Sequence, residues 1–404
     1  MVVVAAVGTG TGLVNQPATF EGVVDWYARM RAHDPVSWDE QYGAYHVFGY
    51  DDIQAVLSDP ATFSSDLTGL MPPQAELELF SRGNFVRMDP PRHDKLRRLV
   101  SKAFTPRVVA ELAPRITTIT DELLDDVAGD PGFDLVQTLA YPLPVTVIAE
   151  LIGVPAADRA EFRRWADSLL NAQLPEKVIP DQERLNQAGE RMRAMIDYLL
   201  AHIRQRRAHP AADLTTTLIA AEVDGEHLTD EEIVGFLGVL LIAGHITTTT
   251  LLTNAVWCLD THRDAAAAVR RDPSKIPAML EEVLRFRSPF PRLARLTTTE
   301  ATVGGQRIAA GKILMPWIAS GNRDERQFPH ADRFDPDRNP NQHLAFGHGI
   351  HFCIGAPLAR LEARLATTIL LERCRDIEIA DGAEFYDPRM MTGARVLPLT
   401  TTWI

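Results

Sequence analysis

Apolar side chains recur every three or four residues over most of the chain, which is the spacing of an amphipathic helix. Between Pro106 and Val127 this spacing is carried by Val108, Leu112, Ile116, Ile119 and Leu123. A basic helix is expected from about Arg92 to Ala103, directly after two prolines that interrupt the chain. Further helices are expected near residues 141–152, 156–171, 181–207 and 356–371. The pattern therefore predicts a mainly helical protein.

The longest predicted helix begins at Thr229 and extends to about Asp260. Thr229 and Glu232 have the spacing of a capping box, and residues 233–244 behind them are apolar on every side. A helix of this kind belongs in the middle of a large core, and 1.5 Å per residue makes it roughly 45 Å long. Polar residues beyond Gly244 argue against a membrane span, so none is expected.

Strand patterns are short and scattered along the chain. They are expected at Ala44 to Phe48, at Leu397 to Thr402, and in a hairpin over residues 301–308 that turns on a glycine pair. The sequence shows no repeats and no linker. Residues 1–404 are therefore expected to form one α+β domain, with residues 1–15 as a flexible tail.

Charge and cysteine content narrow the class of protein. The 41 Lys and Arg residues against 54 Asp and Glu give a net charge of −13, the wrong sign for a nucleic-acid or anionic-membrane partner. Three cysteines are too few for a disulfide framework and suit a reducing compartment. The first residues lack the charged start and long apolar core of a signal peptide. A cytoplasmic globular protein is expected.

Cys353 lies in a glycine-rich loop directly before the helix expected from Ala356. The positive end of that helix is expected to lower the thiol pKa, and the glycines let the backbone approach a flat, bulky group. Three roles are open: an inert buried thiol, a zinc ligand together with His343, His348 and His351, or the axial thiolate of a haem iron. Paired C-x-x-C or H-x-x-x-H spacing is missing from this stretch, which counts against zinc.

The loop carries a specific signature. Phe346, Gly349, His351, Cys353 and Gly355 reproduce every fixed position of the haem-binding signature of the cytochrome P450 family, Phe-x-x-Gly-x-(His/Arg)-x-Cys-x-Gly. The sequence resembles the soluble bacterial class of this family over most of its length. The resemblance implies a single triangular, mainly α domain with a long central helix over the haem and a minor β region. It also implies haem b as the cofactor and Cys353 as its axial ligand.

The resemblance assigns further residues to the fold and to the haem. Glu282 and Arg285 form Glu-x-x-Arg on one face of a predicted helix, where the two side chains can meet. The family's version of this motif is a buried structural network completed by a later arginine, which is matched here by Arg333. The haem propionates need cationic partners. The family positions that bind them are matched by His93, Arg97, Arg295 and His351.

Ala243, Gly244 and Thr247 match the oxygen-activation segment of the family. There the Ala-Gly pair leaves room for dioxygen, and the threonine organises water and protons. The residue before the threonine is usually an acid, but here it is Ile246, which relays no proton. Three explanations are open: His245 replaces the acid, although its helical neighbours point about 100° away; a substrate hydroxyl or ordered water carries the proton; or the chemistry depends less on this relay. We favour the second, because Thr247 and the thiolate site are complete.

The resemblance implies a monooxygenase that inserts one oxygen atom from O2 into a C–H or C=C bond of a small natural product, such as a polyketide or macrolide. Electrons would come from a separate ferredoxin and ferredoxin reductase to a monomeric enzyme. The basic residues expected to face an acidic ferredoxin are Arg92, Lys95, Arg98, Arg360 and Arg364. Two alternatives remain: another haem-thiolate oxidation, such as oxidative coupling or peroxide-driven chemistry, and a non-catalytic haem sensor or carrier.

The substrate pocket implied by the resemblance is mostly apolar, which indicates a fairly large apolar substrate. Its expected lining is Leu70, Met71, Phe85, Leu174, Val239, Leu240, Ile246, Phe290, Leu293 and Met391. The same side chains would equally suit a hydrophobic core, so their positions in the structure decide between the two interpretations.

Overall fold

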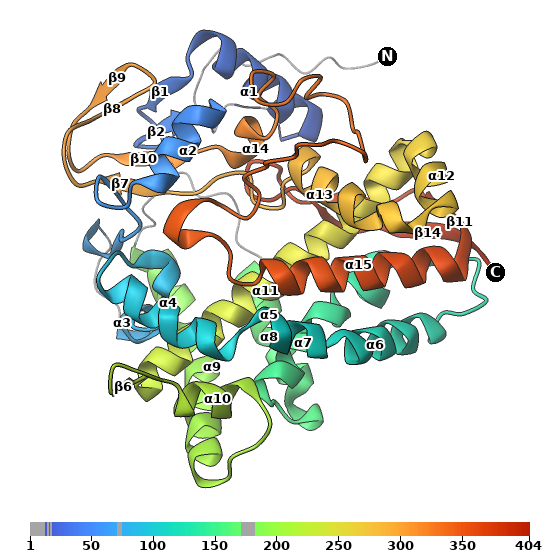
Figure 1. Ribbon diagram of the computed structural model, residues 1–404, viewed down its shortest axis with the longest axis horizontal. Helices are drawn as coiled ribbons and strands as arrows, with labels where there is room; N and C mark the ends of the chain where they lie inside the picture. The colour runs from blue at the N-terminus through green and yellow to red at the C-terminus, as the bar shows by residue number, and fades with distance from the viewer. Residues whose placement is uncertain (1–12, 14–15, 17, 71–74, 171–181) are drawn as a thin grey trace.

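The computed structural model describes residues 13, 16, 18–70, 75–170 and 182–404. The molecule has a triangular outline, with one group of short strands at one corner, a second group near the C-terminus and helices filling most of the rest (Figure 1). The α-helices of the described chain are α1 (Phe20–His33), α2 (Tyr50–Ser58), α3 (Ala75–Ser81), α4 (Arg92–Ala103), α5 (Pro106–Glu111), α6 (Ala113–Asp125), α7 (Pro142–Ile152), α8 (Arg159–Leu170), α9 (Gln182–Ala208), α10 (Leu214–Ala220), α11 (Asp230–Thr261), α12 (Arg263–Arg271), α13 (Ile276–Phe286), α14 (Ile318–Gly321) and α15 (Ala356–Arg373).

The strands are short, and none of those described is longer than six residues. They are β1 (Val36–Asp39), β2 (Ala44–Val47), β3 (Phe63–Ser64), β4 (Gly132–Asp134), β5 (Glu222–Val223), β6 (Glu226–His227), β7 (Arg295–Thr297), β8 (Ala301–Val303), β9 (Gln306–Ile308), β10 (Ile313–Pro316), β11 (Cys374–Ile379), β12 (Glu384–Phe385), β13 (Ala394–Val396) and β14 (Pro398–Trp403). The mainly helical α+β fold that the sequence predicted is confirmed.

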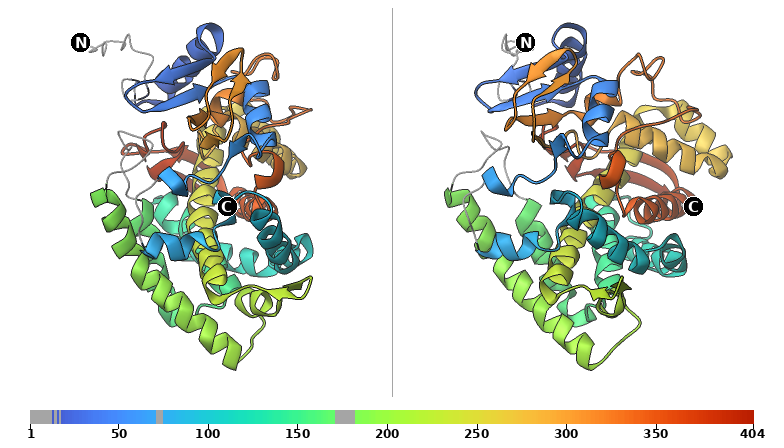
Figure 2. Two further views of the ribbon diagram at one scale, coloured as in Figure 1. Left: turned by 90° about the vertical axis from the view of Figure 1, so that its left-hand side faces the viewer. Right: turned by 60° about the vertical axis from the view of Figure 1, so that its left-hand side comes forward.

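Helix α11 runs through the centre of the molecule (Figure 2). Its first turn is closed as predicted: the Thr229 hydroxyl accepts from the Glu232 N–H, and the Glu232 carboxylate accepts from the Thr229 N–H. By length and hydropathy alone α11 could cross a membrane, but 72% of its most apolar window is buried inside the protein. Its all-round apolar sequence therefore serves the core, as the pattern indicated.

The largest sheet separates two small cores from each other. Its strands lie in the order β1-β2-β10-β7-β3, with β10 parallel to β2 and antiparallel to β7. Alternate residues of β10 face opposite sides of the sheet. Leu314 joins the core under α2, whereas Ile313 and Met315 join an aromatic core under α1 that contains Trp26. A third, much larger core lies among the helices around α11.

Two expectations for individual segments were wrong. The helix expected over Pro106 to Val127 breaks at Leu112 into α5 and α6, because Pro114 has no N–H to donate to the carbonyl four residues back. The expectation of a flexible tail was wrong at Leu13. This residue is fully buried, and its N–H donates to the Asp39 carboxylate at 2.7 Å. The other residues of the expected tail lie outside the described chain.

Candidate functional site

The Cys353 loop is fixed by its own backbone. The Cys353 N–H donates to the Phe346 carbonyl at 2.9 Å, and α15 begins three residues later at Ala356. Gly349 has a φ of +69°, and a Cβ there would lie 2.6 Å from the Leu57 carbonyl oxygen. Only glycine fits both the backbone conformation and this close contact. The signature residues therefore shape a turn that presents the sulfur.

Cys353 keeps accessible surface as a residue, although protein atoms surround its thiol on most sides. Burial raises the thiol pKa, whereas the N–H groups of Gly355 and Ala356 and the charge of Arg97 act to lower it. The expectation of a lowered pKa was therefore wrong for the thiol alone, because desolvation outweighs the helix terminus. A bound metal cation reverses this balance, since a coordinating thiol is deprotonated.

The zinc interpretation has no support in the described residues. They contain no group of three or more His, Cys, Asp or Glu side chains placed to hold a metal ion. His343, one of the proposed ligands, instead lies 3.2 Å from the Glu281 carboxylate, which also binds Arg360. Cys353 therefore stands as a single protein ligand, which suits a haem iron whose other ligands come from the porphyrin.

The four predicted propionate partners are brought together. The rings of His93 and His351 lie 4.5 Å apart, and the buried His93 Nε2 and both His351 ring nitrogens have no hydrogen-bond partner in the described structure. Burial, followed by the charges of Arg295, His93 and Arg97, lowers the His351 pKa to about 3. Buried hydrogen-bond donors that lie beside positive charges are stabilised by a bound anion. The two carboxylates of a haem meet this requirement, so the residues present fit the cofactor.

Two arginines complete this cationic group from different elements. Arg295 on β7 is buried, and burial lowers its pKa to about 10, against the opposing charge of Asp89. Arg97 on α4 donates to the Phe352 carbonyl at 2.7 Å, which ties α4 to the cysteine loop. The sheet and the helical part of the molecule therefore both contribute to the cofactor site.

One stripe of α11 keeps accessible surface, as do Ile242 and Gly244 beside it, while most of the helix is buried. It consists of Val239, Ala243 and Thr247, spaced four residues apart on one helical face. The Thr247 hydroxyl donates to the Ala243 carbonyl at 2.6 Å. Ala243 and Thr247, two of the predicted oxygen-activation residues, therefore lie on this accessible stripe, and their role stays a prediction.

Gly244, which also belongs to the predicted oxygen site, keeps part of its surface accessible and serves helix packing as well. A Cβ at this position would lie 2.7 Å from Ile148 Cδ1 of α7, so the missing side chain lets α7 approach α11.

The structure gives no acid at the place of Ile246. This side chain is 2% exposed and carries no titratable group. The His245 Nδ1 lies 2.8 Å from the Leu241 carbonyl, and its ring packs edge-on against Tyr141. His245 is two residues from both Ala243 and Thr247, which turns it about 200° from their stripe. The first explanation, a relay by His245, therefore loses support.

The predicted Glu-x-x-Arg network is present with a different third arginine. Glu282 and Arg285 are fully buried and form two hydrogen bonds of 2.7 and 2.8 Å. Arg338 completes the network, with Nε 3.2 Å from Glu282 Oε1. Arg333 was the wrong choice: its side chain is exposed and only its carbonyl accepts from Arg285. The Arg333 side chain faces solvent, whereas the Arg338 side chain, five residues later, reaches Glu282.

The predicted substrate pocket is only partly accessible. Val239 and Phe290 keep accessible surface, as do Leu70, Leu293 and Met391, whereas Phe85, Leu240 and Ile246 are packed into the protein, which counts against these three as lining residues. Phe85 stacks against Phe236 and lies under Arg97. Of the others, Leu70 and Leu293 pack against the small cores, Met391 Sδ accepts from the Thr250 hydroxyl, and Met71 and Leu174 lie outside the described residues.

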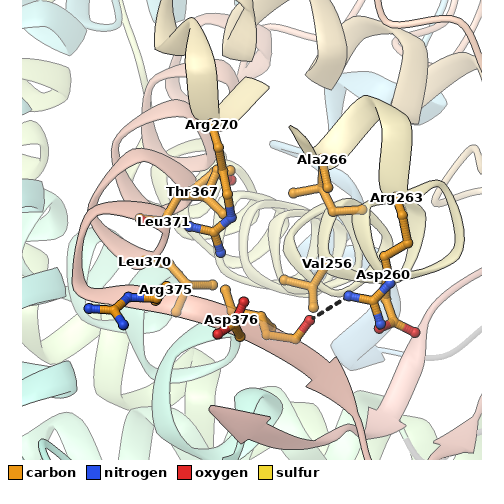
Figure 3. Close-up of a pocket in the computed structure, with 12 residues that line it drawn as sticks. Val256, Asp260, Arg263, Ala266, Arg270, Thr367, Leu370, Leu371, Arg375 and Asp376 are labelled. Carbon is orange, nitrogen blue, oxygen red and sulfur yellow. Dashed lines mark hydrogen bonds and ion pairs between the residues drawn. The ribbon is translucent and has the colours of Figure 1, made fainter. Parts of the chain in front are cut away.

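A separate pocket of about 70 Å³ lies among the end of α11, α12, the far end of α15 and β11 (Figure 3). Arg270 on its wall donates to the carbonyls of Leu371 and Cys374, and Arg263 is paired with Asp260. These arginines close the end of α15 and join it to its neighbours. The pocket lies roughly 20 Å along α15 from the cysteine loop, so it is not part of the haem site.

Comparison with known proteins agrees with this geometry. The sequence model of the family "Cytochrome P450" matches residues 35–383. The chain is 45% identical to the erythromycin C-12 hydroxylase of Saccharopolyspora erythraea over 87% of both chains. It is 42% identical to the cyclomarin C epoxidase CymV of Salinispora arenicola over 92% of this chain and 94% of the relative.

Solved structures give the same result. The ligand-free structure of cytochrome P450 TbtJ1 superposes with a TM-score of 0.86 at 45% identity, covering 95% of this chain and 98% of that one. A mutant of P450 EryK in complex with erythromycin B gives 0.87 at 41% identity, over 94% of this chain and 96% of the other. With its cysteine loop, cationic group and central helix, this chain belongs to the cytochrome P450 family of haem-thiolate monooxygenases.

Proposed function

We propose that this enzyme hydroxylates or epoxidises a mostly apolar natural product of the polyketide or macrolide type, with electrons from a separate ferredoxin and its reductase. When bound, the haem supplies the activation of O2, and its thiolate ligand favours cleavage of the O–O bond. The observation that carries the proposal is the accessible stripe of Val239, Ala243 and Thr247 on a mostly buried helix. A sensor or carrier needs no hydroxyl on such a stripe.

Thr247 is the residue that we assign to proton handling. Its hydroxyl donates to the Ala243 carbonyl and keeps lone pairs that accept from water on the accessible side of α11. Because Ile246 carries no acid, the proton must reach Thr247 through water or through a hydroxyl of the substrate. A polyhydroxylated product of the macrolide type would bring such a hydroxyl with it.

The substrate class is supported by relatives and by the site's apolar lining. Relatives at 45% and 42% identity are named as an erythromycin hydroxylase and a cyclomarin epoxidase. Val239 and the 40% exposed Phe290 present apolar surface. An apolar pocket fixes orientation with few polar groups, which suits a bulky substrate.

We propose the cytoplasm as the location and a monomer as the working state. The support for the location is that Cys258, Cys353 and Cys374 are all free thiols, which suits a reducing compartment. The long apolar helix α11 contributes to the protein's own core.

A second candidate function is a haem-thiolate oxidation that depends less on proton delivery, such as oxidative coupling. The specific observation in its favour is the buried, non-titrating Ile246 beside Thr247. The two candidates predict different products, because coupling removes hydrogen without adding oxygen.

Turnover tests the proposal directly. The holoenzyme is incubated with NADPH, a surrogate ferredoxin, its reductase and a panel of macrolides and apolar peptides. Candidate substrates are first selected by their shift of the iron spin state. Mass analysis of products formed under 18O2 should show a gain of one labelled oxygen atom. Loss of two hydrogen atoms without label would support the second candidate, and binding without any product would leave a sensor.

A further inference from the structure

The outward face of α4 carries a row of cations. Arg92, Lys95, Arg98 and Lys102 are spaced three or four residues apart, so they lie along one side of the helix. Arg97 points to the other side, where it donates to the Phe352 carbonyl in the cysteine loop. Under the proposed function this row is the natural surface for an acidic electron donor, since it lies beside the loop that holds the haem ligand.

A neighbouring hairpin already contacts this row. Strands β5 and β6 pair antiparallel below α4 (Figure 1), and α4 contacts β5. The Lys102 ammonium donates to the Glu222 carbonyl at 2.7 Å, and Arg98 Nη1 lies 3.2 Å from Asp224 Oδ2 at the tip of the hairpin. Two of the four cations are therefore held by the hairpin through its first strand and its turn.

The other two cations are paired in the same way. Lys95 forms an ion pair with Glu226 on β6, and Arg92 lies 4.0 Å from the Glu232 carboxylate at the start of α11. Every cation of the row thus has a partner within residues 222–232. In the free enzyme this segment therefore already pairs with the cations to which an acidic partner protein would bind.

These pairs are exposed and easily exchanged. Arg98 and Asp224 have side chains 59% and 78% exposed, and those of Lys95 and Glu226 are 37% and 58% exposed. Exposed ion pairs contribute about 0–1 kcal/mol each and weaken with salt. A partner protein can reach the row through an open groove beside these pairs. The groove is lined by Arg97, Ser101 and Thr105, among other residues.

We propose that the β5–β6 hairpin is a built-in competitor of the redox partner. In the free enzyme the carboxylates of Asp224 and Glu226 hold Arg98 and Lys95 of this row, and the Glu222 carbonyl holds Lys102. An acidic ferredoxin replaces them with its own carboxylates, and the hairpin moves off the row as the ferredoxin docks. Partners with little negative charge fail to displace it, so the hairpin adds specificity at some expense of affinity. This inference rests on the proposed ferredoxin dependence.

The test neutralises the hairpin acids without changing its turn. Asp224 has a φ of 56°, a conformation that asparagine tolerates well, so Asp224→Asn with Glu226→Gln keeps the hairpin. The control is Glu300→Gln with Glu384→Gln, two exposed acids in other strand regions that give the same change in net charge. A plant-type [2Fe–2S] ferredoxin is titrated onto each holoenzyme at low ionic strength. The hairpin variant should bind roughly 2- to 10-fold more tightly than wild type and control, the gain expected from losing two exposed competing pairs.

Hydrogen exchange gives a second readout that does not depend on affinity. Amides of residues 222–227 should exchange faster in the ferredoxin complex than in the free holoenzyme. If ferredoxin binds wild type, Arg364→Glu weakens binding, and the hairpin variant behaves as its control with unchanged exchange, then the docking face stands and the hairpin proposal is overturned. If ferredoxin binds neither wild type nor any variant, the ferredoxin dependence and the hairpin proposal both fall.

Discussion

At the scale of single residues, Thr247 is the hydroxyl on the accessible stripe of α11. Thr247→Ala should increase the share of NADPH electrons that leave as hydrogen peroxide several-fold, because proton delivery is disturbed while O2 activation continues. Peroxide and product are measured per NADPH consumed. Thr247→Ser keeps a hydroxyl at the same atom and should retain most of the coupling. Unchanged coupling in the alanine variant would remove Thr247 from the mechanism.

Glu362 on α15 makes stability depend on pH. It is fully buried, its Oε1 has no partner in the described structure, and burial raises its pKa to about 8 from a usual value near 4.5. Between these values the unfolded chain ionises while the folded state stays protonated. Stability therefore falls as pH rises through this range, by at most about 1.4 kcal/mol per pH unit.

The matching variants are Glu362→Gln and Glu372→Gln, the second being an exposed glutamate on the same helix. Glu362→Gln does not titrate, so its melting temperature relative to wild type should rise steadily from pH 5 to pH 8. Glu372→Gln should follow the wild-type profile. Parallel pH profiles for Glu362→Gln and wild type would show that Glu362 is charged or solvated in the folded protein.

At the scale of elements, the network around Glu282 joins α13 to the irregular segment before the cysteine loop. Arg338→Ala removes one buried partner of Glu282 and should lower the free energy of unfolding by about 2 kcal/mol. Arg333→Ala, five residues away, removes an exposed side chain and should change it by less than about 0.5 kcal/mol. Urea unfolding of both holoenzymes checks the difference, and equal effects would contradict the assignment of Arg338.

Elements specified by local pattern were predicted well. The capping box at Thr229 located α11, and α4 has the bounds that its flanking prolines indicated. Motif spacing singled out Cys353, in the loop before α15, and Thr247, on α11, because each stands at a fixed offset from its neighbours along the chain. Local spacing did not show which of two arginines turns inward to Glu282, since that depends on a turn over Pro336.

Long-range contacts explain the remaining differences. The burial of Leu13 depends on Asp39, and the pairing of α4 with the β5–β6 hairpin joins segments more than 100 residues apart. Neither contact leaves a periodic trace in the sequence. For the same reason the apolar residues of the expected pocket could not be divided into lining and core until their exposure was known.

At the scale of the whole molecule, net charge and local charge have opposite signs. The chain carries −13, yet α4 and α15 present cations near the cysteine loop. Arg364 is exposed, with no ion pair in the described structure, whereas Arg360 is bound to Glu281. Arg364 is therefore the residue of α15 most available to an acidic partner.

Arg364→Glu should slow reduction of the haem by ferredoxin a few-fold at low ionic strength, and the difference from wild type should shrink as salt is added. Arg271→Glu, an exposed arginine of α12, gives the same change in net charge and serves as the control. Stopped-flow reduction under carbon monoxide measures the rate. Equal rates for both variants and wild type would place the docking face elsewhere.

The chain passes between two separate cores just where the cysteine loop begins. Leu344 belongs to the core under α2, Phe346 packs against the helical core, and Gly349 then lies against the Leu57 carbonyl. Cys353 thus follows a boundary between two separate cores, and the predicted propionate partners His93 and Arg295 belong to α4 and β7 on either side of it. Gentle warming that loosens this boundary would release the haem while the helices and strands around both cores persist.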